Sequence, residues 1–426
     1  MKRIITIAVM CLSCAGVFAQ WEDVEAWNEL EPVDIEIGKN ILLDNELYKG
    51  QWLEDQACAW QKVVNVNPKN EKAWKNLFWA SYLFEIRNKW FSMSEYYINY
   101  LKPDVFINEA DSKTAKVVRR MKEAIPDTYT VNLCSYIWDS NVNDVFDKKT
   151  LHDAIKLAPR DVNAEEIRHL SYGLWQEDPN NEMLYNSNRI LYEKNVYPEH
   201  VMIYGWNILN SMSEGAVYIA YRAFEYEQMK LIQEVFEERK DITLIPYNFF
   251  RNKNYRDYVC ERLKIKPFVC NKNMEYNALC TDFIRHIKRN CKNDVYMSMS
   301  MPFKSKRGYS SKDKTYLGLS PDSIYNEGLI VKYSDKQYDN LKVAIHNVRE
   351  VYKLEYLTLP MLTFEAKTIN EYVDENVIYS MSKLVDQLLD LGYETECWRL
   401  QKIMDKVYYF EGNERIYTKR KRRNLY

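Results

Sequence analysis

Hydrophobic and polar positions follow a helical period over the amino-terminal part of the chain. From Trp21 to about Leu101, apolar and aromatic side chains recur at three- and four-residue intervals, as on one face of an α-helix. The segment 67–70, which contains a proline, predicts the end of one helix and the start of the next. The side chains of this pattern are Trp52, Trp60, Val63, Val64, Trp74, Leu77, Phe78 and Tyr82.

The spacing within this region resembles a degenerate tetratricopeptide array. Counted from Pro68, Trp74 and Leu77 fall where such a repeat keeps its Trp and Leu, although Phe78 replaces the small residue expected next. Pro103 lies 35 residues after Pro68, close to one repeat period. We therefore expect stacked helix pairs.

The helical pattern returns after an irregular section. Residues 125–144 are rich in Thr, Asn and Val, which favours an extended segment or a loop. Residues 154–161 are typical of the end of a repeat, and residues 178–181 predict the start of another helix. The apolar stripe of that helix is expected to contain Tyr185, Ile190 and Leu191.

The pattern changes in the centre of the chain, between residues 214 and 263. Two short runs rich in Val, Ile, Tyr and Thr, residues 215–220 and 242–246, are separated by about twenty residues of amphipathic helical pattern. A further amphipathic run follows at residues 255–263. This arrangement predicts a β-α-β unit with parallel strands.

Beyond the central unit, helices and strands alternate. Residues 295–301 and 328–333 predict strands, and Gly392 is well placed to cap the helix before it in a helical hairpin. Helices are predicted over residues 274–290, 335–352, 375–391 and 395–408.

The predicted fold is mainly α with an α/β module, in which tetratricopeptide-like helical repeats flank a small parallel-sheet β-α-β unit. The expected divisions are a signal peptide at 1–19, a first helical region at 20–125, an irregular segment with a second helical region at 126–212, the α/β module at 213–365, and a helical hairpin with a basic tail at 366–426.

The first residues resemble a secretory leader. Lys2 and Arg3 precede an apolar run that is too short to cross a bilayer, and small residues occupy the positions that a signal peptidase reads. We therefore expect an exported, periplasmic protein that begins at Gln20. A lipid anchor on Cys14 is the alternative, although Cys11 stands where such motifs usually have Leu.

Charge and cysteine content add two expectations. Loss of Lys2 and Arg3 takes the formal net charge from −2 to about −4, which indicates no nucleic-acid partner. Seven cysteines follow the leader. Four of them, from Cys260 to Cys291, have nine or ten residues between neighbours, which matches no zinc spacing. They are either buried small hydrophobic residues or include one local disulfide.

Several segments together resemble the soluble carboxyl-terminal half of protein O-mannosyltransferase-like membrane proteins. The similarity covers about residues 164–408, and its segments are 206–211, 214–219, 231–235, 241–245, 325–329 and the hairpin around Gly392. The family's multi-span catalytic domain is not expected here, so the resemblance implies no sugar transfer. Residues 221–225 also differ from the polar loop of the family. The resemblance implies a soluble accessory domain of an exported glycan or envelope pathway.

Ligands of open α/β sheets bind outside the carboxyl ends of the strands. Aromatic and charged residues at those ends are suited to a sugar or an anionic group, although they are also suited to capping the sheet and facing solvent. The candidate ligand-binding residues are Tyr221, Arg222, Glu225, Tyr247, Asn248 and Lys304.

Signatures of catalysis and cofactor binding are weak. The acids Glu225, Glu227, Glu234, Glu237 and Glu238 fit a solvated helix face better than a catalytic pair. The five histidines are scattered, and no phosphate-binding, dinucleotide or nucleophile motif is found, so no catalytic residue, metal or cofactor is predicted.

The sequence thus favours a non-enzymatic scaffold or adaptor that binds another envelope protein through a concave helical surface. The alternative is a glycan-binding or glycan-processing accessory protein with its site at the strand ends. Basic residues in the loop 302–314 and the tail 419–423 predict at most peripheral membrane contact.

Overall fold

The computed structural model confirms a mainly helical chain with a small sheet. The division at Pro159 and Arg160 separates two compact units, and it falls inside the expected 126–212 region. The expected leader at 1–19, the basic loop and tail, and most of the helix expected at 375–391 lie outside the described residues. The described residues are 31–35, 50–91, 112–141, 147–194, 196–197, 199–221, 223–270, 274–301, 303, 317–354, 384–385, 388–389 and 392–411.

The first unit is built from helices. It contains α2 (Gly50–Val66), α3 (Glu71–Phe91), α5 (Lys113–Ala124), α6 (Tyr129–Asn141) and α7 (Lys148–Leu157). The pair α2 and α3 packs as the sequence predicts, because Trp60, Trp74 and Phe78 are all buried between helices. The indole of Trp74 donates to the carbonyl of Pro68 at 2.8 Å, which fixes the turn to the helix that follows it.

One expectation for this unit is wrong. Residues 129–141, expected to be extended or looped, form helix α6. Its β-branched and polar residues have weak helix propensity, but Tyr136 and Ile137 follow Leu133 at three- and four-residue spacing, and all three are buried. Packing of α6 against α3, α5 and α7 outweighs local propensity.

The second unit begins with α8 (Ala164–Glu177), α9 (Glu182–Glu193) and α10 (Glu199–Asn210). Asn181 caps α9 through a 3.0 Å hydrogen bond from the Met183 amide, in agreement with the predicted helix start. The predicted apolar stripe is correct at Leu191, which is buried, but wrong at Tyr185, which is 52% exposed. Leu184 is buried in its place.

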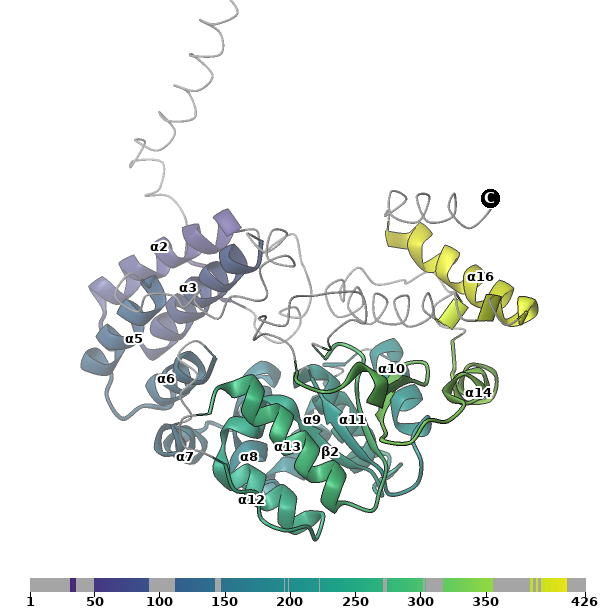
Figure 1. The fold of residues 1–426 in the computed structure, drawn as a ribbon. Coiled ribbons are helices and arrows are strands. Elements are labelled where there is room, and N and C mark those ends of the chain that lie inside the picture. The colour runs from purple at the N-terminus through teal and green to yellow at the C-terminus, as the bar shows by residue number, and fades with distance from the viewer. Residues whose placement is uncertain are drawn as a thin grey trace, which may run out of the picture. The chain divides into compact units, whose positions relative to one another are not determined.

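A five-stranded mixed sheet forms the centre of the second unit, with helices around it (Figure 1). The strand order is β2-β1-β3-β5-β4, and β1 pairs in parallel with β2 and β3, as the β-α-β pattern predicts for its two strands. Strand β5 is antiparallel to β3 and β4. The strands are β1 (Val217–Ala220), β2 (Thr243–Pro246), β3 (Val295–Ser298), β4 (Ile324–Asn326) and β5 (Ile330–Tyr333).

Helices connect these strands. The predicted crossover helix is α11 (Ala223–Val235), and β2 leads through the 3₁₀ helix η4 (Tyr247–Arg251) into α12 (Lys253–Arg262). The remaining helices are α13 (Tyr276–Asn290), α14 (Asn340–His346) with the π-helical turn η6 (Asn347–Val351), and α16 (Glu394–Glu411).

The predicted cap at Gly392 is confirmed by its hydrogen bonds. The Gly392 amide donates to the Leu389 carbonyl at 3.1 Å, and the Tyr393 amide donates to the Leu388 carbonyl at 2.9 Å. Gly392 has a positive φ of 79°, so this pair of bonds is the Schellman arrangement that ends a helix. Among the described helices, none combines the length and apolarity needed to cross a membrane.

Candidate functional site

Tyr221, Glu225, Tyr247 and Asn248 follow the carboxyl ends of β1 and β2, and the structure brings Tyr221 and Tyr247 together. The rings of Tyr221 and Tyr247 have centroids 5.5 Å apart. Asn248 is exposed, and its side-chain amide donates to the Tyr172 hydroxyl at 3.1 Å. Arg222 and Lys304 lie outside the described residues.

Glu225 is held inside the module. It is 1% exposed, and its carboxylate accepts from the Tyr218 hydroxyl at 2.5 Å and from the Tyr221 amide at 3.1 Å. Glu227 is also fully buried, beside Arg168 and the Tyr197 hydroxyl. The expectation that these two acids belong to a solvated helix face is therefore wrong, because they lie on nearly opposite sides of α11 and both are buried.

The strand ends are filled by aromatic packing. Tyr247 is 4% exposed, and its hydroxyl donates to Asn277 Oδ1 at 3.1 Å. Tyr276 packs on it with ring centroids 5.5 Å apart, and the Tyr276 hydroxyl donates to the Tyr247 carbonyl. Burial raises the pKa of the neighbouring Cys280 thiol to about 12, which keeps that thiol protonated and unreactive.

A pocket of about 290 Å³ lies beside the outer edge of β2. Its walls come from the start of α9, from α11 and α12, and from residues 243–245 of β2. The volume is close to the lower bound of about 300 Å³ for small-ligand sites. Since β2 is the last strand of the sheet, the pocket meets its unpaired side.

Two buried tyrosines form the inner part of this pocket. Tyr226 of α11 and Tyr255 of α12 line it, and each is only 2% exposed. Phe249 packs edge-on against both rings, and Trp175 packs against Tyr226. Among the described residues, neither phenol hydroxyl has a hydrogen-bond partner.

Burial raises the pKa of both phenols well above the ordinary value, and neighbouring tyrosines add to the shift. Both hydroxyls are therefore neutral at physiological pH, and each is able to donate and to accept a hydrogen bond. Because Tyr226 and Tyr255 line the pocket and the described residues leave their hydroxyls without a hydrogen bond, both hydroxyls are available to water or to a ligand.

The charged residues of the pocket are largely compensated. Lys230 Nζ lies 2.8 Å from Glu234 Oε1, and Asn188 donates to the other carboxylate oxygen. Arg262 is exposed and hydrogen bonds to the hydroxyl of Tyr258. The pocket thus contains one ion pair, one solvent-exposed cation and several neutral polar groups.

The backbone of Leu244 adds a donor and an acceptor. The Thr243 amide donates to the Ala216 carbonyl at 2.9 Å, so Thr243 faces β1. Successive residues of a parallel strand present their peptide groups to opposite sides, so the N–H and C=O of Leu244 face outward, toward the pocket. Neither group has a hydrogen bond within the described part of the chain.

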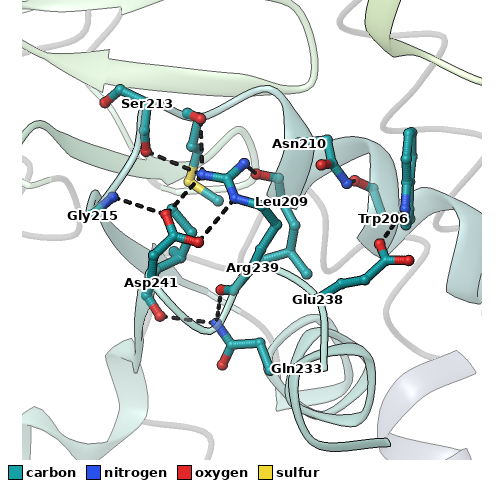
Figure 2. A network of polar contacts seen from close by, with 11 residues as sticks. Trp206, Leu209, Asn210, Ser213, Gly215, Gln233, Glu238, Arg239 and Asp241 are labelled. Carbon is teal, nitrogen blue, oxygen red and sulfur yellow. Dashed lines mark hydrogen bonds and ion pairs between the residues drawn. The ribbon is translucent and has the colours of Figure 1, made fainter. Parts of the chain in front are cut away.

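The opposite, amino-terminal ends of β1 and β2 are closed by the polar network in Figure 2. Arg239 binds the carbonyls of Leu209, Met212 and Ser213, at the end of α10 and just beyond it, and forms an ion pair with Asp241. The amide of Gly215, before β1, donates to Asp241 at 2.8 Å. These groups satisfy one another, so this end of the sheet is structural.

Metal and redox chemistry find little support in the described ranges. No group of three or more His, Cys, Asp or Glu side chains there is arranged to hold a metal ion. Cys260, Cys270, Cys280 and Cys291 are free thiols, so the local disulfide considered from their spacing is not formed.

Known protein families, curated proteins and solved structures were compared with the chain, and no match was found. The resemblance to O-mannosyltransferase-like proteins therefore stays a prediction. Sequence reasoning missed Tyr226, Lys230, Tyr255 and Tyr258, although the four-residue spacing of Tyr226, Lys230 and Glu234 places them on one side of α11.

Proposed function

We propose that the second unit binds a hydroxyl-rich sugar in the pocket beside β2, as part of an exported, glycan-binding accessory protein. The observation that carries this proposal is that Tyr226 and Tyr255 line the pocket and that their hydroxyls have no hydrogen bond to the described residues. A ligand with hydroxyl groups can form hydrogen bonds to both in place of water.

The chemistry of the pocket favours a neutral sugar over an ionic ligand. Sugar hydroxyls donate and accept, as do the two phenols, and the Leu244 peptide offers one group of each kind. Lys230 and Glu234 neutralise each other, so the interior has little net charge to match an ion. The ring of Tyr258 offers an apolar surface for the C–H face of a pyranose.

The test is a titration of the full chain with glucose, mannose and N-acetylglucosamine, followed by calorimetry. We expect one of them to bind at one site and the Tyr226→Phe, Tyr255→Phe double variant to lose that binding. Since the hydroxyls are unpartnered, their removal is expected to leave the melting temperature unchanged or raised.

A matched control for this experiment is Tyr325→Phe. Tyr325 lies on β4, the edge of the sheet opposite β2, so the same change there is expected to leave sugar affinity unaltered. Absence of binding by all three sugars, or full binding by the double variant, would contradict the proposal.

Adaptor function is a second candidate, favoured by Trp398. This residue lies on α16 and is 63% exposed, with Lys402 Nζ 4.4 Å from its ring centroid. An exposed tryptophan is suited to anchor a protein partner. Affinity capture from a cell-envelope extract with the chain and its Trp398→Ala variant tests this role, because a stoichiometric partner should be lost with the variant alone.

A further inference from the structure

An exposed aromatic stripe continues from the pocket along α9. Tyr185 lines the pocket and is 52% exposed, and Tyr192 lies seven residues later on the same face of the helix and is 44% exposed. Phe236, just beyond α11, is 46% exposed and packs edge-on against Tyr192 with ring centroids 5.0 Å apart. We call Tyr185, Tyr192 and Phe236 the aromatic stripe.

The stripe differs from scattered exposed apolar residues. Val66 and Val269 are each 88% exposed, and such single residues are common on protein surfaces. In the stripe, by contrast, Tyr192 and Phe236 are in contact, and Tyr185 lies two helical turns away at the pocket, so the three exposed rings follow one line from the pocket.

We infer that the ligand of this site is a linear glycan chain, with one sugar residue in the pocket and the following residues on the aromatic stripe. This inference rests on the proposed sugar-binding function of the pocket. Seven residues of helix rise ~10.5 Å between Tyr185 and Tyr192, a span that two linked pyranose rings cover. Rigid rings with exposed faces suit the alternating apolar surfaces of such a chain.

The polar residue between the rings fits the same ligand. Arg189 lies four residues after Tyr185, and its guanidinium is held by Glu193 at 2.9 Å. A charge that is already paired offers hydrogen bonds to hydroxyl groups without attracting a free anion. The stripe therefore selects a neutral chain, as the pocket does.

The test compares chain lengths on the full protein. Glucose, mannose and N-acetylglucosamine are titrated beside cellotetraose, maltotetraose, mannotetraose and chitotetraose, for the parent chain and for the Tyr192→Ser, Phe236→Ser double variant. We expect a tetrasaccharide to bind about 10-fold more tightly than its monosaccharide, and the double variant to lose this gain while monosaccharide affinity stays unchanged.

The control is Met183→Ser on the same helix. Met183 is 48% exposed but lies nine residues before Tyr192, which places it half a turn away, on the opposite side of α9. It is expected to change neither affinity. The Tyr226→Phe, Tyr255→Phe variant should keep or exceed the parent melting temperature. The Tyr192→Ser, Phe236→Ser variant loses one surface ring contact and should still unfold cooperatively, with only a small decrease in melting temperature.

The outcomes separate this inference from the proposed function. Equal affinity for monosaccharide and tetrasaccharide, or a gain that survives Tyr192→Ser with Phe236→Ser, overturns the glycan chain and leaves the sugar pocket standing. Failure of every sugar and every tetrasaccharide to bind overturns both.

Discussion

The guanidinium of Arg239 and the carboxylate of Asp241 form a two-point ion pair at the start of β2. Nε lies 3.0 Å from Oδ1 and Nη2 lies 3.1 Å from Oδ2 (Figure 2). The same guanidinium donates to carbonyls at the end of α10 and just beyond it, and Arg239 itself adopts a positive φ of 48°. One side chain therefore joins the end of α10 to the entry of the edge strand.

Arg239→Met should destabilise the second unit. The change removes the ion pair to Asp241, which keeps only the Gly215 amide among the donors described above, and it removes the guanidinium bonds to three carbonyls. We expect this to lower the free energy of unfolding by about 2–3 kcal/mol. Urea denaturation measures the loss. Lys240→Met is the matched control. Among the described residues Lys240 pairs only with the exposed Glu237, so the change should cost less than ~0.5 kcal/mol. Equal effects of the two changes would show that the network contributes no special stability.

The pair also predicts a pH dependence. The hydrogen bond from Arg239 holds the pKa of Asp241 below its ordinary value of 3.8. A carboxyl group whose pKa is lower in the folded state than in the unfolded state stabilises the fold. This stabilisation is complete above the pKa of the unfolded state and is lost as the pH falls through the pKa of the folded state. The stability gap between the parent chain and Asp241→Asn should therefore be constant above about pH 5 and shrink below 3.8. A gap that does not change down to the acid transition would rule out this linkage.

The β-α-β unit was predictable because its signal is local and strong. Continuous runs of Val, Ile and Tyr form buried parallel strands, and β1 is fully buried along its four residues. The cap at Gly392 was predictable for a similar reason, since a glycine after a helical run is favoured where φ is positive.

Helix α6 and the pocket were not predictable, because both depend on tertiary packing. Leu133 and Ile137 stabilise α6 only when α3, α5 and α7 cover them. Tyr226 and Tyr255 lie on different helices, and only their packing around Phe249 brings them to one pocket. The strand-end rule correctly predicted that Tyr221 and Tyr247 lie near each other. It also predicted that Glu225 is accessible to ligands, which is wrong, because the sequence does not show whether an acidic side chain is buried.

Gly328 is predicted to be intolerant of any side chain. Its φ is 109°, and an added methyl group would lie 2.5 Å from the Tyr352 hydroxyl. That hydroxyl accepts from the Leu329 amide at 2.8 Å, so it cannot move without losing a buried hydrogen bond. We expect Gly328→Ala to lower the free energy of unfolding by about 3 kcal/mol.

Gly392→Ala separates backbone strain from steric contact as the causes of that loss. Gly392 also has a positive φ, but no atom lies within 4 Å of an added methyl group. Backbone strain alone should cost about 1 kcal/mol. Thermal unfolding of both variants measures the difference, and equal losses would mean that contact with Tyr352 contributes nothing.

Glu225→Gln tests whether the strand-end acid is structural or binds ligand. Both of its oxygens already accept hydrogen bonds, from the Tyr218 hydroxyl and the Tyr221 amide, and the side chain is buried. The amide has only one acceptor oxygen, so one of these two hydrogen bonds is lost, and we expect a loss of about 1–3 kcal/mol in denaturant unfolding. Sugar affinity should stay at the parent value, because Glu225 does not line the pocket beside β2. Unchanged stability with weakened sugar binding would instead indicate that the ligand binds at the strand ends, where the rings of Tyr221 and Tyr247 lie together.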